Sequence, residues 1–154
     1  MNLDSINRWL TLAANIGVMA GIIFLAFELQ QNTVATQLQA ASNFQSSYTE
    51  IDLSIYGNPE FAELLIKGRE GEEVSGVDQL RLAVFYGGVI RQWQFNHFQY
   101  LSNALSDEIW QANQALMTKI VREDRGLLNH WRMNTREFSP AFNKMFESII
   151  VEGS

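Results

Sequence analysis

The chain has 154 residues, of which 11 are basic and 17 acidic, so its formal net charge is −6. Hydrophobic residues make up 47% of the sequence, which is enough for the core of one small domain. The acidic balance argues against a nucleic-acid-binding protein and against a polybasic lipid-binding surface. The absence of cysteine excludes disulfides, iron–sulfur clusters, thiolate zinc sites and cysteine nucleophiles.

A run of 19 uncharged residues follows a short N-terminal tail, residues 1–8. The run extends from Trp9 to Phe27 and reads WLTLAANIGVMAGIIFLAF. As a helix it would be about 28 Å long, close to the thickness of the hydrocarbon core of a bilayer. A buried core helix normally keeps a polar stripe, and a signal peptide has a shorter apolar run behind a more basic leader. We therefore predict a transmembrane helix over residues 9–28, with residues 9–27 in contact with lipid.

Basic residues around this run indicate its orientation. Arg8 precedes it, and the first basic residue after it is Lys67. Because basic residues are enriched on the cytoplasmic side, we expect the N-terminus in the cytoplasm and the following domain outside it.

Small residues line one face of the predicted membrane helix. Ala13, Gly17 and Gly21 recur every four residues, and Asn15 lies within one turn of that face. A GxxxG pattern permits close contact between helices, although glycine is common in membrane helices. The face predicts contact with a second copy of the chain or with another membrane protein.

Residues 29–154 are expected to form a helical bundle domain. Helical periodicity continues without proline or glycine from Gly21 to Gly57, so we expect one long helix, with a break near Gln30–Thr33 as the alternative. Further helices are predicted at about 59–68, 77–105, 107–123, 127–136 and 140–150. The fold class is thus all-α, a transmembrane helix that continues into a bundle of about four or five helices.

Helix starts are indicated by capping residues. Asn58 and Ser139 each precede a proline, and Ser106 precedes two acidic residues. Ser75-Gly76-Val77-Asp78 resembles a capping box. Residues 77–105 are apolar on two faces, which predicts a position in the middle of the bundle. The second face comprises Leu80, Val84, Gly87, Gln94, Phe98, Leu101 and Leu105.

Two parts of the chain resemble a group of bacterial, mainly marine proteobacterial, single-pass membrane proteins. One part is AANIGVMAGIIFLAFELQQNT, residues 13–33. The other runs from Arg91-Gln92-Trp93 through Leu105-Ser106-Asp107-Glu108-Ile109-Trp110 to Trp131 and Arg136-Glu137-Phe138-Ser139-Pro140-Ala141-Phe142. The resemblance implies a bacterial inner-membrane location and a helical C-terminal domain, which the basic residues described above place in the periplasm. It implies no activity.

Polar residues on the two-faced helix form the only candidate ligand site. Arg91 requires either a structural carboxylate, such as Asp107, Glu108 or Glu137, or an anionic ligand. The candidate ligand-binding residues are Arg91, Trp93, Gln94, His97 and Trp110, with Asn96 and Tyr100 beside them.

No catalytic, metal or cofactor residues can be assigned. His97 and His130 are the only histidines, and neither stands in a metal-binding motif. Gly87-Gly88 lies inside a predicted helix, where close packing explains it better than phosphate binding. The leading hypothesis is therefore a non-enzymatic, membrane-anchored interaction or accessory protein. The alternatives are a sensor that binds a small anion near Arg91 and an enzyme of unidentified class.

Overall fold

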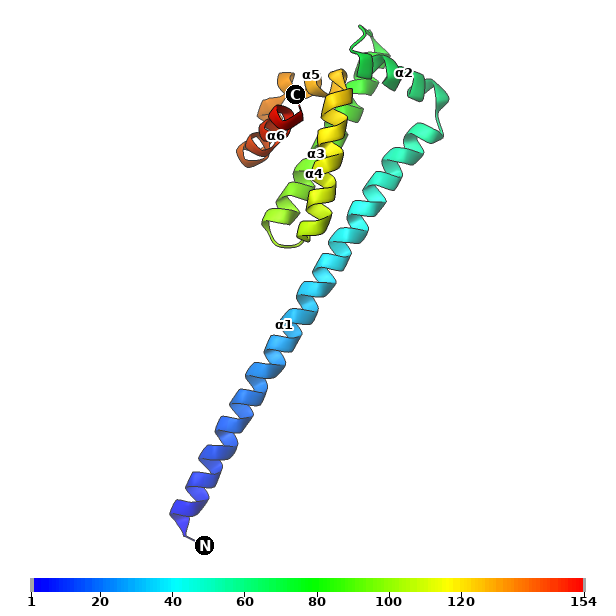
Figure 1. Ribbon diagram of the computed structural model, residues 1–154. Coiled ribbons are helices and arrows are strands. Elements are labelled where there is room, and N and C mark those ends of the chain that lie inside the picture. Colours follow the sequence, from blue (N-terminus) through cyan, green and yellow to red (C-terminus); the bar gives the residue numbers. More distant parts are fainter. Residues whose placement is uncertain (1, 154) are drawn as a thin grey trace. The chain divides into compact units, whose positions relative to one another are not determined.

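A computed structural model describes residues 2–153, with side chains through Val151 (Figure 1). The described residues form six α-helices and one 3₁₀ helix and contain no strand, which confirms the all-α prediction. The helices are α1 (Leu3–Tyr56), α2 (Pro59–Glu70), α3 (Val77–Leu101), α4 (Asp107–Glu123), α5 (Arg125–Met133), η1 (Thr135–Glu137) and α6 (Pro140–Gly153).

The first helix is much longer than a membrane span. α1 has 54 residues and continues through Gln30–Thr33 without a break, and it already includes most of the expected N-terminal tail. The chain divides into two compact units, residues 1–38 and residues 39–154, whose boundary lies within α1.

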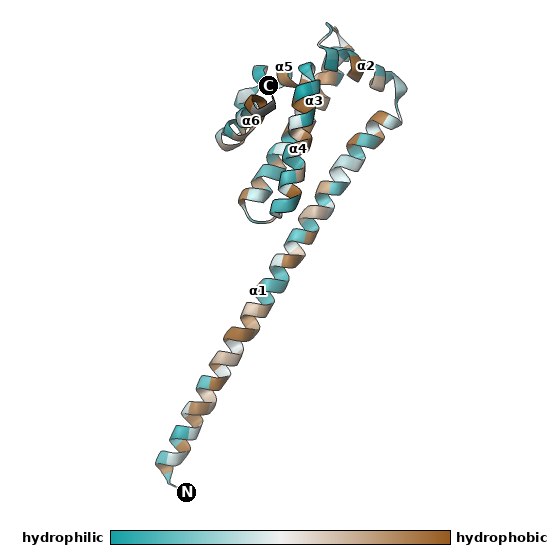
Figure 2. Cartoon of the chain, in the orientation of Figure 1, coloured by the Kyte–Doolittle hydropathy of each residue, from teal (hydrophilic) through white to brown (hydrophobic). Residues whose placement is uncertain are grey.

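In the first unit, the apolar run of α1 is uncovered. Figure 2 shows hydrophobic colouring concentrated in this part of the helix. Among the described residues, α1 is the one helix long and apolar enough to cross a membrane, and its most apolar stretch has no buried residue.

In the second unit, helices begin where the sequence predicts caps. The side chain of Asn58 accepts a hydrogen bond from the backbone N–H three residues on, at 3.0 Å, and Ser106 and Ser139 do the same at 3.4 and 3.2 Å. Pro59 and Pro140 occupy the first helical positions, where a missing N–H costs nothing. These local signals are sufficient because a cap needs only neighbouring residues.

Two local predictions on α3 are wrong. The predicted capping box is absent, since the N-cap is Gly76, at φ 60°, without a side-chain hydrogen bond. The helix also ends at Leu101 rather than at Leu105. Asn103 adopts a left-handed conformation, at φ 57°, which ends the helix and lets Leu105 reach the core after a turn.

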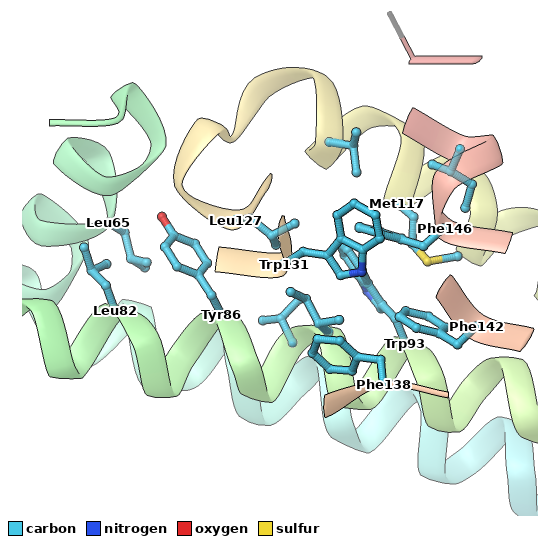
Figure 3. Close-up of a cluster of buried hydrophobic side chains, with 14 of the residues drawn as sticks. Leu65, Leu82, Tyr86, Trp93, Met117, Leu127, Trp131, Phe138, Phe142 and Phe146 are labelled. Carbon is cyan, nitrogen blue, oxygen red and sulfur yellow. The ribbon is translucent and has the colours of Figure 1, made fainter. Parts of the chain in front are cut away.

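The core of the second unit lies on one side of α3. Figure 3 shows aromatic and aliphatic side chains from α3, α4, α5 and α6 packed together. Trp93, Phe142 and Phe146 are fully buried, and the rings of Phe142 and Phe146 stack at 5.6 Å. Losing one such aromatic side chain costs about 3–5 kcal/mol.

The opposite side of α3 is not covered as the two-faced pattern predicts. Leu80, Val84, Phe98 and Leu101 are all more than half exposed. α3 packs against α2, α4 and α5, and the face that carries Leu82, Tyr86 and Trp93 is buried, whereas the large side chains of the second apolar face are exposed.

Candidate functional site

The candidate ligand residues of the sequence do not surround one pocket. Trp93 has no exposed surface, and its indole N–H donates a 3.0 Å hydrogen bond to the hydroxyl of Tyr48 on α1. The Tyr48 hydroxyl in turn donates to Oδ1 of Asn113 on α4 at 2.9 Å. These hydrogen bonds connect α1, α3 and α4 in the core, so Trp93 has a structural role.

His97 and Trp110 lie in an aromatic cluster. Their ring centroids are 5.4 Å apart, and the ring of Tyr100 stacks on Trp110 at 5.0 Å. Phe142 lies on another side of His97, at 6.2 Å. Burial lowers the pKa of the His97 imidazole, so the side chain is neutral at pH 7.

Gln94 and Asn96 make local structural contacts. The side-chain oxygen of Gln94 accepts a 2.7 Å hydrogen bond from the backbone N–H of Ser139, which joins α3 to the start of α6. Asn96 is fully buried, and its oxygen accepts a hydrogen bond from the Gln92 amide at 3.0 Å.

Arg91 lies apart from the buried members of this set, with its side chain 56% exposed. Its Nη1 is 3.9 Å from Oε2 of Glu137, one of the carboxylates that the sequence offers as a partner. An exposed ion pair of this length contributes about 0–1 kcal/mol to the stability of the fold, so Glu137 binds Arg91 only weakly.

A cleft of about 540 Å³ adjoins Arg91. It is formed by the end of α2 and the loop after it, α3, α5 and η1. Its lining residues are Gly68, Gly71, Glu72, Val74, Gln79, Leu82, Ala83, Val84, Tyr86, Arg91, Gly126, Asn129, His130, Met133, Asn134 and Glu137.

His130 on α5 is the cleft residue that the sequence analysis did not associate with Arg91. Burial lowers its pKa, the positive charge of Arg91 lowers it further, and the carboxylate of Glu137 opposes both effects. Asn134 donates a 2.7 Å hydrogen bond to the backbone oxygen of His130 and holds the end of α5. His130 and Arg91 are 39 positions apart in the sequence, and neither belongs to a motif that would connect them.

Gly87 lies directly beneath both side chains. A Cβ atom at this position would be 3.1 Å from Nη1 of Arg91 and 3.3 Å from Nε2 of His130. Gly88, in contrast, has nothing within 4 Å of such an atom. The prediction of close packing at the glycine pair therefore holds for Gly87 and not for Gly88.

Tyr86 forms the inner wall of the cleft. Gly68 and Gly126 make room for its hydroxyl, which would lie 2.6 and 2.7 Å from a Cβ atom at those positions. Burial and the nearby carboxylate of Asp124 raise the pKa of Tyr86. Asp124 caps α5 by accepting a 2.9 Å hydrogen bond from the backbone N–H of Leu127, and burial raises the pKa of its carboxyl group.

The described part of the chain has no cluster of three His, Asp or Glu side chains that could hold a metal ion. Comparisons of the chain with protein families, curated proteins and solved structures find no match. Function is therefore inferred from the chain's own residues.

Proposed function

We propose that the chain is a single-pass protein of the bacterial inner membrane whose helical domain binds another protein and performs no catalysis. The observation that carries this proposal is an apolar face of α3 whose large side chains stay exposed within the 39–154 unit. The uncovered run of α1 supports the membrane anchor.

The anchor is supported by the cost of leaving this run in water. Eleven large apolar side chains between Trp9 and Phe27 are exposed. They are Trp9, Leu10, Leu12, Ile16, Val18, Met19, Ile22, Ile23, Phe24, Leu25 and Phe27. Burial of each such side chain away from water stabilises by about 1.5–3 kcal/mol, and a bilayer provides that burial for the whole circumference of the helix.

Binding of a partner is supported by the uncovered face of α3. Six large apolar residues recur along it at helical spacing, interrupted only by Gly88 and Arg91, and their exposed fractions range from 47% to 72%. They are Val77, Leu80, Val84, Phe95, Phe98 and Leu101, and we call them the α3 stripe. Exposed apolar side chains that gather on one face of a domain mark an interaction site.

Catalysis has less support than binding. The described lining of the cleft contains no serine, threonine or lysine, and the chain has no cysteine. His130 thus has no hydroxyl, thiol or amine nucleophile beside it except the buried phenol of Tyr86.

The proposal is tested by purifying the full chain from membranes in mild detergent. We expect the chain to resist extraction by alkaline carbonate and to elute with a stoichiometric partner, either a different protein or a second copy. Leu80→Glu and Phe98→Glu place charges on the α3 stripe and should release the partner without loss of folding, because both side chains are exposed. Gln111→Glu adds the same charge at an exposed position of α4 and serves as the matched control.

Three results would contradict the proposal. Extraction of the chain by carbonate would contradict the membrane anchor. Purification of a monomer without a partner would contradict the interaction. A partner that the stripe variants retain as well as the control does would show that the α3 stripe is not the contact.

A further inference from the structure

Two nitrogen donors from different helices converge above the backbone of α3. Nη1 of Arg91 and Nε2 of His130 lie 3.1 and 3.3 Å from the position that a Cβ atom of residue 87 would occupy. Nη2 of Arg91 is 3.4 Å from the same point. Because residue 87 is glycine, the guanidinium and the imidazole can both lie close over the helix, one from α3 and one from α5.

The donors of Arg91 are largely unused within the described chain. Its one ion pair is the 3.9 Å contact with Glu137, and both side chains are more than half exposed. A guanidinium has five N–H donors in a planar fork that matches a carboxylate group. The carboxylate of Glu137 lies 3.9 Å from this guanidinium, which leaves room for the carboxylate of a ligand to approach it more closely.

The other charges of the cleft restrict the class of ligand. Glu72 and Glu137 line it together with Arg91, so the cleft carries more negative than positive charge when His130 is neutral. A multiply charged phosphate compound would be repelled. A single carboxylate fits better, on a small molecule whose remaining polar groups meet the amides of Gln79, Asn129 and Asn134.

We propose that this cleft binds a small carboxylate-containing molecule, whose carboxylate is held above Gly87 by Arg91 and by His130 in its Nε2–H tautomer. The site adds a ligand to a domain that otherwise binds protein, and it borders the α3 stripe, because Val84 belongs to both and Arg91 lies between Val84 and Phe95. It differs from the pocket expected from the sequence, because Trp93 and Trp110 take no part in it.

A pair of glycine variants tests the site without removing either donor. Gly87→Ala places a methyl group where the two donors converge, and Gly88→Ala makes the same change one residue away in open space. Both variants gain helix propensity, so both should fold. The full chain in detergent is melted in acetate, lactate, succinate or phosphate, each compared with sodium chloride at equal ionic strength.

We expect at least one of the carboxylates to raise the melting temperature of the wild type and of Gly88→Ala, by about 3 °C at tenfold excess over the dissociation constant. Gly87→Ala and Arg91→Gln should lose this shift. Arg91→Gln also preserves the test if Gly87→Ala does not fold, because its side chain is exposed.

Three results would overturn the proposal. In the first, no carboxylate raises the melting temperature of the wild type above its value in sodium chloride. In the second, phosphate raises the melting temperature more than any carboxylate does. In the third, both Gly87→Ala and Arg91→Gln keep the increase that the carboxylate causes in the wild type. None of these depends on the protein partner, so failure of the ligand site leaves the proposed interaction intact.

Discussion

His97 lies between Trp110 and Phe142 in the core of the 39–154 unit. Burial lowers the pKa of its imidazole below the ordinary value of 6.5. Below that ordinary value the unfolded chain therefore binds more protons than the folded chain does. The free energy of unfolding consequently falls as the pH drops through about 6.5 and levels off below the pKa of the folded state.

We expect the melting temperature to be lower at pH 5.5 than at pH 7.5, and the difference to be smaller in His97→Phe. Phenylalanine keeps an aromatic ring beside Trp110 and cannot take up a proton. His130→Gln serves as a control, because the pKa of His130 is also lowered and its removal should leave the contribution of His97 in place. The measurement is thermal unfolding followed by tryptophan fluorescence. Equal pH dependence in the wild type and His97→Phe would contradict this account.

Some residue roles can be predicted from the sequence, and others cannot. The caps at Asn58, Ser106 and Ser139 depend only on the next three residues, and the structure has all three. The position of Arg91 beside His130 depends on how α5 packs on α3 at Gly87. No local pattern encodes that packing, so the sequence identified the arginine but not its neighbour.

At the scale of the helix, α3 shows what periodicity can and cannot predict. Two apolar faces predict burial on both sides, yet the α3 stripe is exposed. The spacing of apolar residues shows which faces of a helix are apolar, but it does not show whether this chain or another molecule covers them. The wrongly predicted end of α3 has a different cause. Asn103 adopts a left-handed conformation, which asparagine adopts more readily than most residues, and the prediction continued the apolar spacing to Leu105 instead of ending the helix before this asparagine.

α1 carries the second helix-scale prediction, at Gly17 and Gly21. A Cβ atom at either position would have nothing within 4 Å, so larger residues there would not strain the chain itself. If this face contacts another helix in the membrane, Gly17→Ile and Gly21→Ile should weaken association about tenfold, because they hold the backbones apart.

The measurement is energy transfer between labelled copies, or recovery of a membrane partner, in lipid vesicles. Met19→Ile, on the opposite face of the same helix, is the matched control and should leave association unchanged. Association that survives both glycine substitutions would show that this face is not a contact.

At the scale of the whole molecule, the absence of cysteine makes the orientation directly measurable. Single cysteines at Asn2 and Glu73 report the two sides of the apolar run, because Asn2 precedes it and Glu73 is an exposed loop residue of the 39–154 unit. A maleimide that cannot cross membranes labels only the residues outside the cytoplasm.

We expect Glu73→Cys to react in spheroplasts and Asn2→Cys to react only after permeabilisation. Arg8 lies before the apolar run, and no basic residue follows it until Lys67, so the positive-inside rule predicts a cytoplasmic N-terminus. Replacing Gln30, Gln31 and Asn32 by lysine should reverse this pattern, because the basic residues would then lie after the run. Labelling of Asn2→Cys alone in the otherwise unaltered chain would assign the opposite orientation, and labelling of both cysteines without permeabilisation would exclude a single span.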